Sequence, residues 1–298
     1  MNIKELPDKE LFTPGHTACP GCAAPIIMRH VMKIFGEKSV VYNPACCLLV
    51  FGGTYPWVAW EVPYNHVAFE NTGACITGIS RALKNIGRDD VTVLGIAGDG
   101  VTADIGFQAL SGAAERNEDV VYIMYDNEAY MNTGIQRSGS TPYGAWTTTT
   151  PAGSKIKGKE RFKKDMATIM LVHNIPYVAT LNIAYPADFL RKLQKAKDMD
   201  GFRFLQIYAP CPTGWRADPD SAVSLSKLAV ETGMWTLWEA ENGKVTINVK
   251  PKFTPVKEYL GPQGRFRHLD DDQHAIIDKW VRDKWEKDEK ILSALGGE

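Results

Sequence analysis

Short apolar runs alternate with longer amphipathic segments along the first 215 residues. The runs are rich in β-branched and aromatic residues and predict strands, while the segments between them have helical length and periodicity. The predicted strands cover residues 39–42, 91–97, 120–125, 177–180 and 204–209, and the predicted helices cover residues 23–35, 72–84, 103–115, 161–173 and 186–197. This alternation predicts an α/β fold with a mainly parallel, doubly wound sheet that binds ligands at the carboxyl ends of its strands.

Two regions depart from the alternation. Residues 126–158 are polar and rich in Thr and Gly, which predicts a long functional loop. Beyond residue 215, helices over 221–231 and 271–290 flank a Pro-containing segment and predict an extension without a second core, packed on its own domain or on a partner. We expect one structural domain with an N-terminal segment (1–50), a core (51–215) and a C-terminal arm (216–298).

The net charge and the hydropathy of the chain indicate whether it binds nucleic acid or a membrane. Lys and Arg total 34 against 35 Asp and Glu, so no broad attraction to nucleic acid or to anionic membranes is expected. The first ten residues lack the apolar run of a signal peptide, and no stretch approaches the roughly 20 apolar residues of a membrane helix. We therefore expect a cytoplasmic protein that binds neither nucleic acid nor a membrane. In that compartment its six cysteines should stay reduced.

A predicted buried strand runs directly into Gly98, Asp99 and Gly100, and a helix is expected to follow near Ala103. Glycines allow a bulky anion to approach the backbone, and a helix N-terminus offers N–H groups to phosphate. A carboxylate beside phosphate is repulsive unless a cation lies between them, so Asp99 is expected to bind Mg²⁺. The alternative is a tight surface turn with Asp99 as a helix cap.

A second predicted strand ends just before Asn127. Neighbouring parallel strands end at the same sheet edge, so the Asn127 amide and the Ala129 carbonyl can reach the same ion. The separation of Asn127 from Gly100 corresponds to about one helix and one strand. The sequence therefore predicts a site for a magnesium-bound diphosphate.

Several cysteines fall at the same predicted edge. Cys19 and Cys22 form a C-x-x-C pair before a helix, while Cys46, Cys47 and Cys211 each follow a predicted strand. A C-x-x-C pair can be a redox dithiol, half of a zinc site or two ligands of an iron–sulfur cluster. The dithiol needs a preceding strand, which residues 11–18 do not provide, and spacing alone does not separate zinc from a cluster.

A family resemblance identifies candidate ligands for both the predicted diphosphate site and the cysteine group. The separation of Gly98-Asp99-Gly100 from Asn127 resembles the thiamine diphosphate signature. The whole pattern resembles the β subunit of the pyruvate:ferredoxin oxidoreductase family, a group of 2-oxoacid:ferredoxin oxidoreductases. The segments that carry this resemblance are 16–22, 43–47, 68–71, 130–134, 209–215 and the tail 255–269. It covers nearly the whole chain and implies the thiamine-diphosphate-binding fold.

The resemblance implies roles for individual residues. Cys19, Cys22, Cys47 and Cys211 would hold one [4Fe–4S] cluster, with Cys46 as a substitute for Cys47. Independently of the resemblance, Cys75 falls in a predicted helix and is expected to be a buried packing thiol. Asn132 would be the catalytic residue that faces the reacting carbonyl. From its side chain alone, Arg137 is a candidate for binding a substrate carboxylate or a coenzyme A phosphate, and a surface salt bridge or a subunit contact is an equal alternative. No histidine base is required; His30, for example, fits an apolar helix pattern.

The implied activity is coenzyme A-dependent oxidative decarboxylation of a 2-oxoacid, or its reverse, with single-electron transfer from thiamine to the cluster. Pyruvate is the expected substrate, and another small or branched-chain 2-oxoacid or oxalate is the alternative. The implied partners are an α subunit that supplies the thiamine-activating glutamate, a γ subunit or domain, a ferredoxin-like δ subunit or domain, and external ferredoxin. Two other hypotheses are a non-oxidative thiamine enzyme with structural zinc and a non-catalytic zinc-binding assembly subunit.

Overall fold

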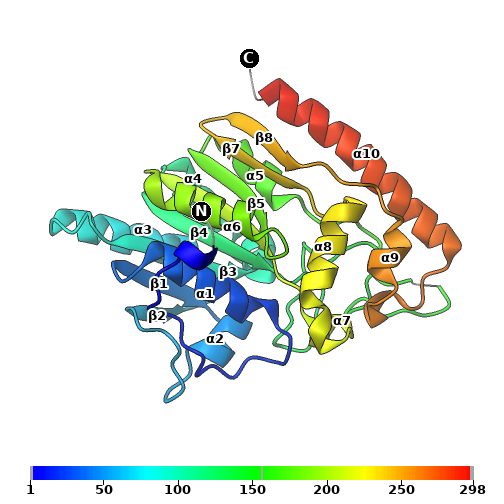
Figure 1. The fold of residues 1–298 in the computed structure, drawn as a ribbon, viewed down its shortest axis with the longest axis horizontal. Helices are drawn as coiled ribbons and strands as arrows, with labels where there is room; N and C mark the ends of the chain where they lie inside the picture. Colours follow the sequence, from blue (N-terminus) through cyan, green and yellow to red (C-terminus); the bar gives the residue numbers. More distant parts are fainter. Residues whose placement is uncertain (1–2, 156, 296–298) are drawn as a thin grey trace.

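Eight strands form one continuous sheet in the computed structural model, which describes residues 3–155 and 157–295 (Figure 1). The order across the sheet is β2-β1-β3-β4-β6-β5-β7-β8. The strands are β1 Ser39–Pro44, β2 Tyr64–Val67, β3 Thr92–Gly98, β4 Val120–Asp126, β5 Tyr177–Asn182, β6 Phe202–Tyr208, β7 Leu237–Glu241 and β8 Lys244–Val249. Strands β1 to β6 pair in parallel, and β7 and β8 extend one edge in antiparallel fashion. The predicted mainly parallel sheet is confirmed.

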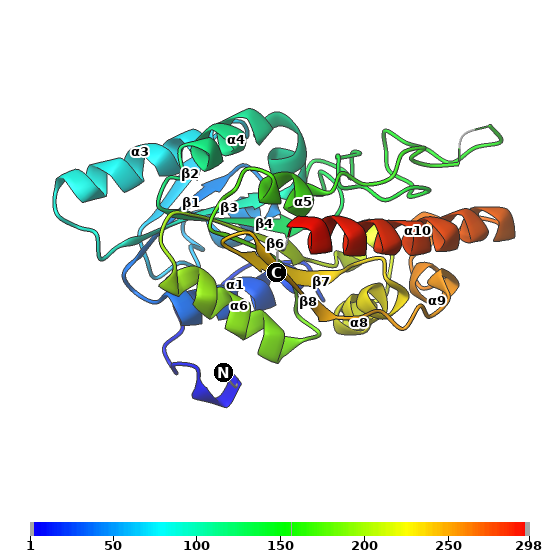
Figure 2. The same cartoon turned by 90° about the horizontal axis from the view of Figure 1, so that it is seen from above.

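Helices cover both faces of this sheet (Figure 2). α1 (Ala23–Phe35) and α6 (Pro186–Asp198) pack together on one face, and α3 (Thr72–Asn85), α4 (Phe107–Glu115) and α5 (Met166–Leu171) cover the other. All seven residues of β4 are buried, which explains the continuous apolar runs in the sequence. In the described ranges no helix combines the length and apolar content that a bilayer crossing requires.

The C-terminal region has an apolar cluster of its own. It contains side chains from α7 (Pro212–Trp215), α8 (Ala222–Thr232), α9 (Val256–Leu260) and α10 (Asp271–Leu295). These helices pack with Tyr208 of the sheet, so the extension packs on its own chain. Leu237 of β7 also belongs to this cluster, so the cluster adjoins the sheet, and the expectation of no second core stays a prediction. The boundaries at residues 50 and 215 stay predictions, and residues 1, 2 and 296–298 lie outside the described part.

The helix predicted over 161–173 is shorter in the structure, because α5 begins only at Met166. Lys163 lies before it and places its ammonium between the carboxylates of Asp126 and Glu128. Asp165 then caps the helix by accepting the N–H of Thr168 at 3.1 Å. Buried ion pairing therefore holds this segment out of the helix.

The segment after β3 also differs from the prediction. Helical backbone begins at Asp99, before the expected start near Ala103, and continues as a π-helix over Val101–Ile105 before α4. The short elements α2 (Cys47–Gly52) and β2 were not predicted. The described residues of segment 126–158 contain no α-helix or β-strand beyond β4, which agrees with the predicted loop; residue 156 lies outside the description.

Candidate active site

Four adjacent parallel strands, in the order β1-β3-β4-β6, end at one edge of the sheet. Cys46 and Cys47 follow β1, and Asp99 follows β3. Asn127 follows β4, and Cys211 lies three residues beyond β6. The topology therefore brings to one edge the predicted diphosphate residues, two of the four predicted cluster cysteines (Cys47 and Cys211) and the substitute Cys46.

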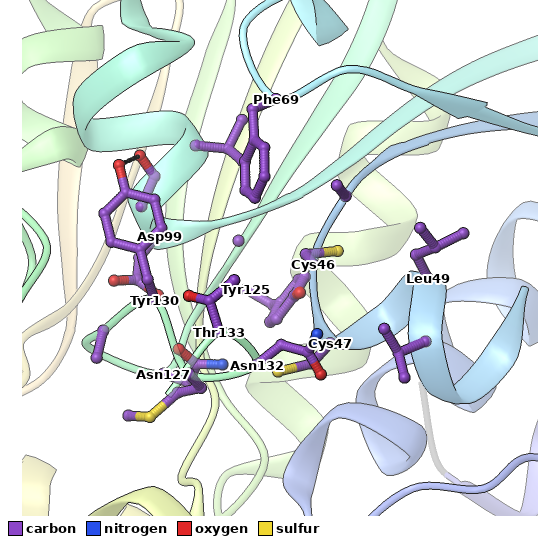
Figure 3. Close-up of a pocket in the computed structure, with 17 residues that line it drawn as sticks. Cys46, Cys47, Leu49, Phe69, Asp99, Tyr125, Asn127, Tyr130, Asn132 and Thr133 are labelled. Atoms are coloured by element: carbon purple, nitrogen blue, oxygen red, sulfur yellow. Dashed lines mark hydrogen bonds between the residues drawn. The ribbon is translucent and has the colours of Figure 1, made fainter. Parts of the chain in front are cut away.

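A cavity of about 570 Å³ opens at this edge. Figure 3 shows Asp99 and Tyr130 on one side of it and Cys46 and Cys47 on the other. Gly98, Gly100, Asn127, Ala129 and Asn132 also line it, together with the apolar side chains of Leu49, Val50, Phe69 and Met131. The cavity thus gathers every predicted diphosphate residue and the predicted catalytic Asn132.

Asn127 points at two oxygen atoms. One terminal atom of its amide lies 2.9 Å from Asp99 Oδ1 and 2.9 Å from the Ala129 carbonyl oxygen. In the protein alone, the NH₂ group satisfies both acceptors. Turning the amide by 180° puts its oxygen 2.9 Å from each of the other two oxygens, close to the separation of about 2.9 Å between neighbouring ligands of octahedral Mg²⁺. The donor set of Asp99, Asn127 and Ala129 therefore fits the predicted cation.

Asp99 is fully buried, and its two oxygens have different neighbours. Oδ2 accepts the hydroxyl of Ser138, while Oδ1 is the oxygen beside Asn127. Burial raises the pKa of Asp99 well above its ordinary value, and repulsion from Asp126 raises it further. A divalent cation at Oδ1 would favour the ionised form that this environment disfavours.

The peptide around Asn127 rests on a buried ionic network that the sequence did not reveal. Lys163 Nζ donates to Asp126 Oδ2 at 3.1 Å and to Glu128 Oε1 at 3.0 Å, and Arg265 pairs with Glu128 Oε2 at 2.6 Å. Burial alone would raise the pKa of Glu128, but the two cations outweigh it and lower that pKa. Arg265 is 2% exposed, so this pair is almost fully desolvated.

The glycines of the Gly-Asp-Gly segment have different roles in the structure. A Cβ at Gly100 would lie 2.4 Å from the ring of Tyr130, whose hydroxyl donates to the Gly100 carbonyl at 2.8 Å. A Cβ at Gly98 would make only ordinary contacts, the nearest at 3.4 Å from the Tyr125 hydroxyl oxygen. Gly100 therefore permits the packing of Tyr130 over the site, and Gly98 leaves the cavity wall open.

Three partly buried thiols, those of Cys22, Cys47 and Cys211, lie in one neighbourhood, with Cys19 at its exposed margin. Burial raises the pKa of Cys22 to about 12, and Cys211 and Cys19 contribute by charge repulsion. The pKa of Cys47 is likewise raised by burial and by repulsion from Cys211, Cys46 and Cys22. Within the described ranges, no three His, Cys, Asp or Glu side chains converge closely enough to share a single ion.

Cys46 and Cys47 have different surroundings. The Sγ of Cys46 accepts the side-chain amide of Asn43 at 3.2 Å, and Asn43 also bonds the Ile96 carbonyl of β3 at 2.7 Å. The thiol of Cys47 instead interacts electrostatically with Cys22 and Cys211. Cys47 therefore lies within electrostatic reach of Cys22 and Cys211, whereas Cys46 has a polar partner of its own; which of the two binds a metal stays a prediction.

Backbone contacts hold the Cys19–Cys22 loop against the strand ends. The N–H of Ala23 donates to the Pro210 carbonyl at 3.4 Å, and the N–H of Thr17 donates to the Phe51 carbonyl of α2 at 2.9 Å. Gly21 has φ +74°, and a Cβ there would lie 1.8 Å from the Pro219 carbonyl oxygen. Only glycine fits this contact.

The remaining residues considered in the sequence analysis are Asn132, Arg137, the histidines and Cys75. Asn132 is exposed at the cavity wall, and Arg137 is exposed farther along the same loop. None of the histidines lines the cavity: His16, His30, His66 and His173 each have a ring nitrogen within hydrogen-bonding distance of a protein backbone group. Cys75 is only partly buried on α3, so the prediction of a buried packing thiol was wrong.

Sequence comparisons identify the family of proteins to which this chain is similar. The family described as "Thiamine pyrophosphate enzyme, C-terminal TPP binding domain" matches residues 50–207. The chain is 49% identical to ketoisovalerate oxidoreductase subunit VorB of Pyrococcus furiosus, over 99% of this chain and 98% of that one. It is 51% identical to pyruvate synthase subunit PorB of Methanothermobacter thermautotrophicus, over 93% of this chain and 96% of that one.

A solved structure shares the fold. A chain of 2-oxoglutarate:ferredoxin oxidoreductase from Magnetococcus marinus superposes with a TM-score of 0.57 at 22% identity, covering 76% of this chain and 80% of that one. The fold, the family match and the near-full-length identity agree. This chain therefore belongs to the thiamine pyrophosphate enzymes and, among them, to the PorB/VorB β subunits of the 2-oxoacid:ferredoxin oxidoreductases.

Proposed function

We propose that Asp99, Asn127 and Ala129 bind the Mg²⁺ ion of thiamine diphosphate, with Gly98 and Gly100 beside its diphosphate. The observation that carries this proposal is the pair of 2.9 Å separations that the Asn127 amide makes with Asp99 Oδ1 and the Ala129 oxygen. The first helical residues after β3, Asp99 to Val101, also line the cavity. A helix start leaves N–H groups without intrahelical acceptors, which suits a phosphate.

The second part of the proposal concerns the cysteines. Cys19, Cys22, Cys47 and Cys211 would hold a [4Fe–4S] cluster, which accepts and passes on single electrons. The mutual repulsion of these thiols and the position of Cys47 in the cavity wall support it. Thiolate ligands must lose their protons, and burial, which raises the pKa of Cys22, disfavours that loss unless a metal supplies compensating positive charge.

The protein's contribution to catalysis follows from the lining of the cavity. Bound thiamine diphosphate would accept the electron pair left when CO₂ departs from a 2-oxoacid. Leu49, Val50 and Phe69 would keep the reacting carbon away from water. Asn132 stands at the same wall, where its amide N–H could stabilise negative charge on the substrate carbonyl oxygen.

We propose pyruvate as the substrate, converted with coenzyme A to acetyl-CoA and CO₂ while two electrons pass one at a time to ferredoxin. A branched-chain 2-oxoacid is the second candidate. The apolar cavity wall of Leu49, Val50 and Phe69 suits a hydrocarbon side chain, and one of the relatives is named for ketoisovalerate. The same wall offers no basic side chain to an acidic substrate such as 2-oxoglutarate.

The proposed complex contains further chains: an α subunit that supplies the thiamine-activating glutamate, γ and δ subunits or domains, and external ferredoxin. An apolar surface beside the cavity supports a partner there. Val50, Tyr55 and Trp57 are 48%, 87% and 62% exposed, and the segment after α2 projects from the body of the protein (Figure 1). We also propose a cytoplasmic location, where thiols stay reduced.

Anaerobic purification of the assembled complex tests the proposal. We expect a dithionite-bleachable brown chromophore with about four irons in this chain. With coenzyme A and ferredoxin, pyruvate should be turned over faster than 2-oxoisovalerate, and 2-oxoglutarate should be inactive. One zinc without colour in this chain would contradict the cluster, and turnover of 2-oxoglutarate alone would contradict the substrate class.

A further inference from the structure

A buried turn over residues 138–141 lies behind the cation site, outside the residues assigned to it above. The N–H of Ser138 donates to Thr141 Oγ1 at 2.9 Å, and the N–H of Thr141 donates to the Ser138 carbonyl at 3.3 Å. Ser138 and Thr141 are both 0% exposed. The turn is therefore closed on itself and shielded from solvent, so the hydroxyls of Ser138 and Thr141 are fixed in direction.

The first hydroxyl acts on Asp99. Ser138 Oγ donates to Asp99 Oδ2, while the opposite oxygen, Oδ1, lies 2.9 Å from the Asn127 amide. A carboxylate with one oxygen held in this way has little freedom to rotate about its χ2 torsion. Ser138 therefore fixes which oxygen of Asp99 faces the cation position.

The second hydroxyl acts on the other side of the same position. Thr141 Oγ1 donates to the Glu128 carbonyl at 2.6 Å, and Glu128 stands between Asn127 and Ala129. One four-residue turn thus holds both segments that carry the proposed ligands, one after β3 and one after β4. Any displacement of the turn would move Asp99 relative to Asn127.

Lys159 anchors the turn through its ammonium group. Nζ donates to the carbonyl oxygens of Ser138 at 3.3 Å, Gly139 at 3.1 Å and Thr141 at 2.5 Å. The residue is 3% exposed, and its backbone exchanges hydrogen bonds with Gly144 and Ala145 at 2.8 and 3.0 Å. Three carbonyls converging on one buried ammonium make the turn a rigid support.

We propose that Ser138 is a positioning residue for the cation, and that Lys159 holds the turn that presents it. The inference rests on the proposed magnesium site. It adds that the buried turn over residues 138–141 fixes the orientation of the Asp99 carboxylate at that site. Mg²⁺ demands near-octahedral ligands at short distances, whereas Ca²⁺ accepts irregular ones. Mn²⁺ also occupies octahedral six-oxygen sites and serves here as the probe for the magnesium position. Loss of the Ser138 hydroxyl should therefore weaken Mn²⁺ binding more than Ca²⁺ binding, which a general loss of stability would not do.

Titration of the assembled complex with Mn²⁺ and with Ca²⁺, in the presence of thiamine diphosphate, tests this inference. Ser138→Ala should raise the Kd for Mn²⁺ about tenfold, the effect of one lost charge-assisted hydrogen bond, and the Kd for Ca²⁺ by less than half as much. Ser140→Ala is the matched control, because this neighbouring hydroxyl is equally buried and has no hydrogen-bond partner. Its Kd for Mn²⁺ should change by less than about twofold.

Each result has a separate meaning. Wild-type complex that binds neither ion with thiamine diphosphate would contradict the proposed function itself. Normal wild-type binding together with unchanged Mn²⁺ binding in Ser138→Ala would overturn the role of Ser138. Equal losses for the two ions would also overturn it. If Ser138→Ala does not assemble, Ser138→Cys, which fills similar space with a weaker donor, should show the same ordering of Mn²⁺ and Ca²⁺.

Discussion

Trp215 donates its indole N–H to the backbone carbonyl of Asn127 at 2.9 Å, so the helix after Cys211 is bonded directly to the proposed diphosphate segment. The indole is 0% exposed and stacks against the guanidinium of Arg265, whose carbon lies 3.9 Å from the ring centroid. Cys211 and Asn127 thus belong to one rigid unit. The cysteine group and the cation site are expected to respond together to changes in this contact.

Replacing Trp215 by Phe should test that link. Phe keeps much of the buried area but leaves the Asn127 carbonyl without its donor, which should lower the free energy of unfolding by about 1–2 kcal/mol. Urea unfolding measures the change. The control is Trp57→Phe, because Trp57 is 62% exposed; it should stay within about 0.5 kcal/mol of the wild type. Equal effects for the two variants would contradict the link.

Gly100→Ala should disrupt the site by displacing Tyr130, because the added Cβ would lie 2.4 Å from its ring. We expect a loss of about 1–3 kcal/mol in stability from overpacking, and at least tenfold weaker thiamine diphosphate binding. Gly78→Ala on α3 is the control, since nothing lies within 4 Å of the added atom. It should be neutral or stabilising by up to about 1 kcal/mol. Unchanged cofactor binding in Gly100→Ala would refute the placement of Tyr130.

The two adjacent cysteines should differ in iron binding. Cys47→Ser should remove most of the iron, because Cys47 is close enough to Cys22 and Cys211 for their charges to repel one another. Cys46→Ser should retain it, because that thiol is bonded to Asn43. Iron and sulfide analysis after anaerobic purification measures both. Iron retained in Cys47→Ser and lost in Cys46→Ser would reverse the assignment.

Glu239 should contribute to the pH dependence of stability. Burial raises its pKa, but hydrogen bonds from Arg191, Tyr177 and Asn248 outweigh that effect and lower the pKa to about 2. A carboxylate with a lowered pKa stabilises the folded state above its unfolded pKa of about 4.3, and the contribution is lost as the pH falls toward about 2. Glu239→Gln should therefore flatten this part of the stability curve, measured by urea unfolding at stepped pH. A parallel, merely shifted curve would contradict the assignment.

The sequence predicted the elements that bury a regular apolar pattern. The helix predicted over residues 23–35 has those bounds in α1, and the strand predicted over 120–125 is β4 with one further residue. The antiparallel strands β7 and β8, of which β8 forms the sheet edge, were missed. Exposed and partly buried residues alternate along β8, and its pairing partner cannot be identified from local composition.

At the site, too, some residues could be predicted from the sequence and others could not. Asp99 and Asn127 were predictable because strand ends share an edge in a parallel sheet. Ser138, Lys159, Lys163 and Arg265 were not assigned roles in the site, because their partners lie far away in the sequence and meet only after folding. Arg265 stands in a tail segment that resembled the family, so the resemblance marked its neighbourhood without giving its contact with Glu128.

Magnesium-dependent binding of thiamine diphosphate tests the central claim most directly. Calorimetric titration of the assembled complex should show binding that requires Mg²⁺. Asp99→Asn keeps the side-chain shape but removes the charge, and it should weaken the binding at least a hundredfold, or by about 2.7 kcal/mol. Wild-type binding without any divalent cation, or unchanged binding in Asp99→Asn, would contradict the account.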